Sequence, residues 1–460
     1  MRRSWIAGLA GLSLNLPGLA AANDLLDSYH LAQQQDQTFQ AALHLRDATI
    51  EARPQARSVL LPQITAQANY QREREHVLSS ANPLSPSVVS YFGVKSYGLS
   101  LSQVLFDWSA FETLAEADRQ AAAAEASFRS AEQSLVYRTA QAYFAVLNAA
   151  DTLRADLDAQ NSFKEQLDQA QKKFEVGLAA ITDVRNAQAS YDTTSALVIA
   201  DRQALDSAKR SLGQVVGKPV SDVSRLQDDI PLAAPEPASV EDWTAAAGKD
   251  NPDLMSALDT AEAARKAVDA AEGKYLPTVG LSGTLNRQTT HSQFGDDALA
   301  DVIGVSATWN VFQGGLTASQ VRQSKATYLQ SKAQYEGERR VVDQAARDAF
   351  EGVVSGIASV KANKQAVISN QTSLEATQVG LRVGTRTEID VLTARQLLAV
   401  AQRSYYQSRY AYLSNVLLLK QQAGRLAEAD LANIDRLLTS TPATPLPPPP
   451  PAARVPPEKP

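Results

Sequence analysis

A narrow apolar stripe beginning at Ala110 is the longest pattern in the sequence. Apolar residues, mostly alanine and leucine, recur from there to Leu135 at spacings of three and four. This spacing places them on one helix face, and the small alanines allow another helix to approach closely. No strong helix breaker occurs between Trp108 and Gly177. We therefore expect one helix of about 65 residues, or about 100 Å at 1.5 Å per residue.

A return helix follows this long helix. After Gly177 and a short link, Thr182 and Asp183 are suited to cap a helix that runs to about Leu212, because such side chains accept hydrogen bonds from the first turn. Glycines and a proline between residues 213 and 219 are expected to end it. The return helix is about half as long as its partner, so we expect a helix at about 240–273 to stack on its end.

The same plan occurs a second time. The segment FEVGLAAITDV at residues 174–184 returns about 207 residues later as LRVGTRTEIDV at residues 381–391. A long structural unit has therefore been duplicated. The second copy predicts a long helix at about 316–379, a turn at Gly384 and a return helix at about 388–422. This second return helix is also short, and we expect a helix at about 24–59 to stack on its end.

Four other segments alternate between apolar and polar residues. They lie at residues 64–71, 96–102, 279–286 and 303–309. A period of two, with one apolar and one polar face, predicts β-strands. Strands of about ten residues are typical of an outer-membrane barrel. Four strands are too few to close a barrel, and open edges in lipid leave backbone groups without partners. Several chains must therefore cooperate.

Aromatic residues gather where these strands meet the helices. Phe106, Trp108 and Phe111 lie there in the first copy, and Trp309 and Phe312 in the second. Such rings fit a membrane–water boundary. The alternative is that they cap the end of a soluble sheet.

The two ends of the chain differ in amino-acid composition from the rest. Residues 1–22 combine two arginines, an apolar stretch and a run of alanines, which predicts a signal peptide and an exported protein; a membrane anchor is the alternative. Residues 441–460 are rich in proline and predict a disordered tail, or a ligand for a proline-binding domain.

Composition argues against several classes of function. The formal net charge is −6 without a basic block, so a nucleic-acid partner is not expected, and the absence of cysteine excludes disulfides. The four histidines are scattered, and no catalytic or metal-binding motif is present. We therefore expect no enzyme, cofactor or metal site, and we interpret the carboxylates of the long helices as solvated.

The hairpin turns are the informative polar sites. Asp183 and Asp390 occupy equivalent positions in the two copies, whereas Arg386 is present only in the second. Both aspartates are suited to cap helices, a role worth about 1 kcal/mol each. Asymmetry at a duplicated site also suggests a gate, and the two roles are compatible.

The segments at residues 174–192 and 383–393 resemble the two hairpin turns of the TolC family of outer-membrane efflux and secretion channels. The resemblance extends over about residues 24–435. It implies a mainly α-helical fold with a β-barrel, in which each chain supplies four antiparallel strands and long helical hairpins in two tandem repeats. A homotrimer would form a 12-stranded outer-membrane barrel and a periplasmic α-helical tunnel.

The resemblance also implies partners. Such channels sit in outer-membrane lipid and dock at their tips onto a periplasmic membrane fusion (adaptor) protein and an inner-membrane RND, MFS or ABC transporter. They export drugs or proteins. A multidrug channel and a type I secretion channel are not distinguished, because the inner-membrane partner selects the cargo. The rival from another class is a non-conducting coiled-coil structural or adaptor protein of the envelope.

Site residues follow from the resemblance by position. Thr182 and Asp183 match residues that bond across to the second hairpin, Arg386 matches their basic partner, and Asp390 matches a carboxylate ring at the entrance. Two positions depart from the family, since Leu381 replaces a tyrosine of this latch and Thr393 replaces a second entrance aspartate. The tip turns that adaptors engage match Gly177, Leu178, Gly384 and Thr385.

The predicted organisation begins with a signal peptide at residues 1–22 and ends with a tail at 441–460. The first repeat, at 23–232, contains a strand pair at 62–106, a helical hairpin at 108–213 and, at 218–240, a segment near mid-length that we call equatorial. The second repeat, at 240–438, contains a strand pair at 277–312 and a helical hairpin at 315–423.

Overall fold

The computed structural model describes residues 24–76, 89–291 and 297–442 of the 460-residue chain. The predicted signal peptide and the proline-rich segment beyond Pro442 lie outside these residues. Two compact units are present, and each draws segments from both sequence repeats. Of the described residues, the first unit takes 24–40, 132–247 and 345–442, and the second takes 41–76, 89–131, 248–291 and 297–344.

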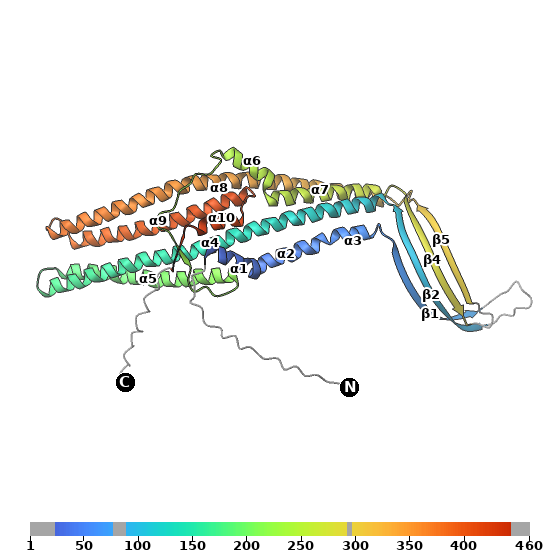
Figure 1. Cartoon of the computed structure of the whole chain (residues 1–460), viewed down its shortest axis with the longest axis horizontal. Coiled ribbons are helices and arrows are strands. Elements are labelled where there is room, and N and C mark those ends of the chain that lie inside the picture. Colours follow the sequence, from blue (N-terminus) through green and yellow to red (C-terminus); the bar gives the residue numbers. More distant parts are fainter. Residues whose placement is uncertain (1–23, 77–88, 292–296, 443–460) are drawn as a thin grey trace, which may run out of the picture. The chain divides into compact units, whose positions relative to one another are not determined.

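Two long helical hairpins dominate the secondary structure (Figure 1). The first consists of α4 (Trp108–Glu175) and α5 (Ile181–Val216), and the second of α8 (Leu316–Arg382) and α9 (Glu388–Gln422). The long helices contain 68 and 67 residues, which confirms the predicted lengths. The apolar stripe of α4 is buried at four of its positions, Ala110, Ala117, Phe128 and Leu135, and partly buried at the other four, Leu114, Ala121, Ala124 and Ala131.

The helix expected at residues 24–59 is broken into α1 (Leu25–Gln35), α2 (Gln37–Ile50) and α3 (Ala52–Ser58). At the first break the Asp36 carboxylate accepts a hydrogen bond from the Phe39 amide at 2.7 Å. This bond caps α2, because it satisfies an amide that has no partner within the helix.

The helix expected at residues 240–273 is likewise divided, into α6 (Val240–Asp250) and α7 (Pro252–Gly273). Asn251 caps α7 by accepting from the Leu254 amide at 3.1 Å, and Pro252 occupies the first helical position, where its missing N–H costs nothing.

Glycine has two different roles at the end of α5. The helix was expected to stop near Leu212 but continues through Gly213, where a Cβ would lie 3.0 Å from the Lys218 carbonyl oxygen. It ends at Gly217, whose φ of 73° is the left-handed conformation that favours glycine. The first glycine therefore makes room for the returning chain, and the second terminates the helix.

The N-terminal helix lies against a different hairpin from the one we expected. A Cβ on Gly217 would lie 2.4 Å from the Gln35 Cβ, so α1 abuts the end of α5 rather than the end of α9. Its first turn is bound by the short helix α10 (Glu428–Asp435), because Asp435 accepts from the Leu25 amide at 3.0 Å. The two ends of the described chain do meet here, as the sequence predicted.

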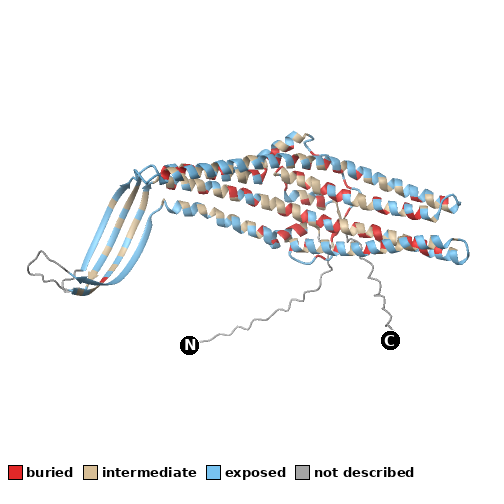
Figure 2. Cartoon of the chain, turned by 180° about the vertical axis from the view of Figure 1, so that it is seen from behind, coloured by how far each residue is buried: buried red, intermediate tan, exposed pale blue. Residues whose placement is uncertain are grey.

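The strands form the predicted antiparallel sheet. Its order is β1-β2-β4-β5, from β1 (Gln63–His76), β2 (Val89–Phe106), β4 (Thr278–Thr290) and β5 (Asp297–Thr308). The β2–β4 pair joins the two repeats. The strands contain 12 to 18 residues and are longer than expected. Much of the sheet is exposed in the single chain (Figure 2).

A second, small sheet lies in the first unit. It pairs β3 (Ser224–Leu226), within the predicted equatorial segment, with β6 (Leu438–Pro442). Residues 441 and 442, which we assigned to the tail, therefore belong to a strand.

In the described part of the chain, no helix combines the length and the apolar character needed to cross a membrane.

Candidate functional site: the hairpin tips and the contacts between the hairpins

Both hairpins turn through the same backbone motif. The Leu178 amide donates to the Lys173 carbonyl at 2.7 Å, and the Thr385 amide donates to the Gly380 carbonyl at 2.9 Å. Between them Gly177 and Gly384 have φ of 76° and 79°. This is the Schellman motif, which uses a left-handed residue to satisfy the last carbonyls of a helix. Space around each glycine is open, so the backbone conformation, and not crowding, requires glycine.

Asp183 and Asp390 are the third residues of the return helices, and their carboxylates cap the helices by reaching back to the amides of Ala180 and Thr387. The Ala180 amide donates to Asp183 at 3.3 Å, and the Thr387 amide donates to Asp390 at 2.8 Å. The latter bond is the main reason that the pKa of Asp390 is lowered. Thr182, expected to share this role, is exposed in the first turn and does not cap α5. The capping interpretation is thus confirmed for both aspartates.

The predicted latch is not formed within the single chain. Among the residues that the structure describes, no hydrogen bond or ion pair joins Thr182 or Asp183 to Arg386. The Arg386 side chain instead lies over Gly380, where a Cβ would come within 2.6 Å of its Cγ. The latch assignment therefore stays a prediction about the assembled protein.

The two positions that depart from the family pattern have local roles. Leu381 packs against a small apolar cluster that contains Leu374 and Val391, on the seam between α8 and α9. The Thr393 hydroxyl donates to the Ile389 carbonyl of its own helix at 2.8 Å. Neither residue supplies a charge at the tip.

A polar contact that sequence reasoning missed joins the two hairpins near their tips. The Lys173 ammonium lies 2.7 Å from Glu388, which also accepts from the Gln166 amide. The Glu388 side chain is only 11% exposed. We call these three residues the tip clamp. Its signal was visible in the duplicated segments, because Glu388 stands where the first copy has Ile181.

An apolar cluster lies beside the tip clamp. Leu392, one turn along α9 from Glu388, is 5% exposed among Phe163, Leu167, Ala170 and Ala187 of the first hairpin. A buried leucine contributes about 1.5–3 kcal/mol, so this contact fixes the second hairpin against the first.

Two carboxylates on α4 correct our expectation that such groups are solvated. Asp151 is 2% exposed and accepts from the Tyr410 hydroxyl at 2.6 Å, and Asp156 is 1% exposed and lies 3.1 Å from Arg403. Both partners belong to α9. These buried groups are tolerated because each is paired, and they extend the contact between the hairpins toward the middle of the first unit.

Asp201 on α5 is expected to make stability depend on pH. Burial raises its pKa from 3.8 to about 7, and the neighbouring Asp156 adds to the effect. Because the folded state binds this proton more tightly than the unfolded state, the contribution of Asp201 to stability should be fully present in acid and be lost as pH rises from about 4 to about 7. We expect the Asp201→Asn variant to lose most of this decline in thermal unfolding midpoints. The exposed Asp206→Asn is the control, and an unchanged decline in Asp201→Asn would contradict the interpretation.

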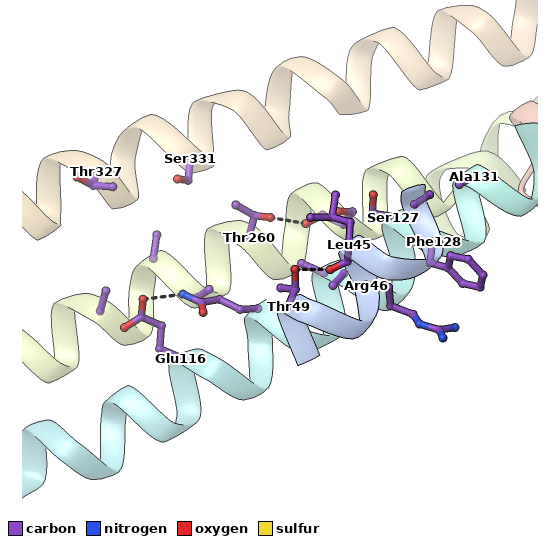
Figure 3. A pocket seen from close by; sticks show the side chains of 18 residues that line it. Leu45, Arg46, Thr49, Glu116, Ser127, Phe128, Ala131, Thr260, Thr327 and Ser331 are labelled. Atoms are coloured by element: carbon purple, nitrogen blue, oxygen red, sulfur yellow. Dashed lines mark hydrogen bonds between the residues drawn. The ribbon is translucent and has the colours of Figure 1, made fainter. Parts of the chain in front are cut away.

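The second unit contains an open groove between α2, α4, α7 and α8 (Figure 3). It has a volume of about 530 Å³ and is lined mainly by alanines and other small residues. Arg46 stacks over the Phe128 ring at 4.3 Å on its border, and burial raises the pKa of Glu116 within it. In the residues described, no group of three or more potential metal-ligating side chains was found.

Comparison with known proteins gives consistent results. The profile of the family described as outer membrane efflux protein matches residues 28–218 and 243–425. The chain is 33% identical to the outer membrane protein TolC of Escherichia coli K12, over 95% of this chain and 89% of the relative. It is 30% identical to the alkaline protease secretion protein AprF of Pseudomonas aeruginosa, over 94% and 90%.

Solved structures show the same fold. The outer membrane protein VceC of Vibrio cholerae aligns with a TM-score of 0.76 at 20% identity, covering 87% of this chain and 96% of that chain. The CmeC outer membrane channel of Campylobacter jejuni aligns with a TM-score of 0.76 at 18% identity, covering 95% and 98%.

Proposed function

Because the chain belongs to the outer membrane efflux protein family, we propose that three copies of it assemble into one export channel. The protein is an outer-membrane protein of efflux or secretion. The three sheets would close into one cylinder of twelve strands, and the helical hairpins would form a tunnel in the periplasm. Its relatives include a protease secretion protein, so the cargo is either small molecules or proteins.

The open sheet is the observation that carries this proposal. In the part of the chain that the structure describes, β1 and β5 each pair on one side only. A free edge in lipid leaves backbone groups without hydrogen-bond partners, at a cost of several kcal/mol for each group. Pairing β5 of one copy with β1 of the next would give the backbone groups of both edge strands hydrogen-bond partners. Three copies paired in this way would close into one barrel large enough to surround a pore.

The tips supply the proposed entrance. Three copies of Asp390 around the channel axis would favour cations, because like charges held close together attract counter-ions. The Asp183–Arg386 latch would then form when copies meet, and it would keep the entrance narrow. This role is additional to the capping role of the aspartates.

We propose that the tips also dock onto a periplasmic adaptor protein and, through it, onto an inner-membrane transporter. The turn residues carry unusually exposed apolar side chains, since Leu178 is 78%, Val176 69% and Val383 68% exposed. Exposed apolar groups at the end of a helical hairpin are suited to helix-in-groove contacts.

A Leu178→Asp variant is expected to lose most export of a fluorescent efflux substrate from cells, because the charge would disrupt an apolar contact with the adaptor. Its conductance in lipid bilayers should equal that of the parent. Leu329→Asp, at a site 62% exposed on α8, is the control and should export normally. Normal export by Leu178→Asp would argue against docking at this tip.

Cell fractionation tests the proposal directly. The channel predicts heat-modifiable trimers in the outer-membrane fraction. The rival, a non-conducting coiled-coil protein of the envelope, predicts a soluble periplasmic monomer, which would overturn the channel.

A further inference from the structure

The four-stranded sheet has one apolar face, which the strand register defines. Leu99 pairs with Ala66 on one side and with Leu285 on the other, and Ile64 pairs with Leu101. Directly opposed residues point to the same face, and side chains alternate between faces along each strand. We call the face that carries these five residues the apolar face.

Basic residues follow on this same face toward the hairpin turns of the sheet. On β1 the alternation places Arg72 and Arg74 beyond Ile64 and Ala66. Lys95 pairs with Tyr70, and Arg287 pairs with Tyr97, which brings both onto the apolar face as well. We call these four residues, Arg72, Arg74, Lys95 and Arg287, the cationic band.

Acidic residues of β1 lie on the opposite face. Glu73 and Glu75 alternate with the arginines, so they point away from the cationic band. On β1 the two signs of charge are therefore sorted between the faces, whereas Asp297 and Asp301 of β5 lie on the same face as the cationic band. Solubility alone does not require this sorting, because positive and negative side chains on either face would keep the protein soluble equally well.

Most of the cationic band has no acidic partner. Arg287 forms an ion pair with Asp297 at 2.6 Å. Arg74 stacks over the Tyr91 ring at 5.7 Å. Within the described chain, no carboxylate forms an ion pair with Arg72, Arg74 or Lys95, and all three are exposed. A net positive surface thus adjoins the apolar face.

Spacing and aromatic residues indicate what this surface meets. From Ile64 to Arg72 the strand rises about 26 Å along its own axis, or about 20 Å along the membrane normal at a barrel tilt of about 40°, which is somewhat less than the apolar band of outer-membrane proteins, about 25 Å tall. Tyr70 and Tyr97, 65% and 57% exposed, lie on the same face, and they pair directly with Lys95 and Arg287 of the cationic band. Tyrosines mark the depth of lipid headgroups, so the cations lie at the depth of headgroup phosphates.

We propose that the cationic band binds the phosphate groups of anionic lipids in the leaflet around the hairpin-turn end of the sheet. This inference rests on the proposed function, because it requires that the sheet spans the outer membrane. The apolar face contacts the acyl chains, and Arg72, Arg74 and Lys95 form charge-assisted hydrogen bonds with the phosphates. The lipid is bound through its phosphate and not through a sugar or an acyl chain alone.

The test measures binding of a phosphorylated glycolipid, lipid A, to the full-length protein in detergent by native mass spectrometry, in parallel with the same lipid after removal of its phosphates. The parent is expected to bind the phosphorylated lipid at least about tenfold more tightly. Replacing Arg72, Arg74 and Lys95 by alanine should weaken its binding about a hundredfold, at about fivefold per cation. Arg72→Lys with Arg74→Lys should retain most of the affinity.

Glu73→Gln with Glu75→Gln is the matched control, since these residues lie at the same height on the other face; it should bind as the parent does. Equal binding of both lipids, or full binding by the alanine variant, would overturn the proposal. Competition by inorganic phosphate at equal concentration would also overturn it, in favour of a site for the free ion. Bilayer conductance of the same parent sample separates the two proposals, because a parent that binds the lipid but does not conduct contradicts only the channel.

Discussion

A double variant in which alanine replaces Asp183 and serine replaces Arg386 is expected to form a channel with severalfold higher conductance than the parent. The structure shows no contact between the two residues within one chain, so any latch they form must depend on assembly. Removing both charges would release the tips and leave the three Asp390 carboxylates to repel one another in the narrow entrance. Single-channel recording in planar bilayers measures the change.

Capping makes a control for this experiment necessary. Asp183 also accepts from the Ala180 amide, and loss of such a cap costs about 1 kcal/mol. Asp183→Asn therefore serves as a second variant, since asparagine caps nearly as well but carries no charge. A third variant, Arg382→Ser, removes an exposed charge from the last turn of α8. If the Asp183 and Arg386 double variant conducts as the parent does, the latch assignment is wrong.

Replacing Glu388 by alanine is expected to have the second largest effect, because it removes the centre of the tip clamp. The Lys173 ammonium and the Gln166 amide would both lose their acceptor. Lys173 is 43% exposed and would turn toward water, so we expect a loss of about 1–2 kcal/mol in the free energy of unfolding rather than the larger cost of a fully buried charge. The freed second hairpin should also make openings of the channel more frequent.

A double-mutant cycle with Lys173→Ala measures the clamp itself. Once Glu388 is gone, removing Lys173 should cost little more, so the two effects should not add. Glu375→Ala, which removes an exposed carboxylate that accepts a hydrogen bond from Gln371 of the same helix, is the control. Additive losses in unfolding midpoints would show that the two residues are independent.

The long helices were predictable from sequence because continuous three-four spacing without a breaker leaves few alternatives. The breaks within residues 24–59 and 240–273 were missed, although each has a local cause. Asn251 and Pro252 form a cap and a first helical position, a signal that apolar spacing alone does not contain. At Asp36 the cap depends on one side-chain bond to the Phe39 amide, which interrupts an otherwise helical sequence.

The order of the helices along the chain does not determine which return helix the N-terminal helix stacks on. A glycine with positive φ follows both return helices, at Gly217 and Gly424, and only the structure shows that Gln35 lies against Gly217. The adjacency of the chain ends was predictable from the duplicated plan, but the hairpin that the N-terminal helix would contact was not.

Part of the candidate site was likewise predictable from the sequence, and part was not. The caps at Asp183 and Asp390 were predicted, because both aspartates occupy equivalent positions in the first turn of a return helix. The tip clamp joins Lys173 to a residue 215 positions away, a distance at which spacing gives no information. Only the exchange of Ile181 for Glu388 between the two copies indicates it. Asp151 and Asp156 were misjudged because their partners also lie on a distant helix.

Single-channel recording of the unmodified protein in a planar lipid bilayer tests the central claim most directly. If three copies close one sheet around a pore, trimers purified from membranes will insert and give stable, cation-selective conductance steps. Absence of any conductance from a protein that purifies as a water-soluble single subunit, with its four strands covered by its own chain, would contradict the account.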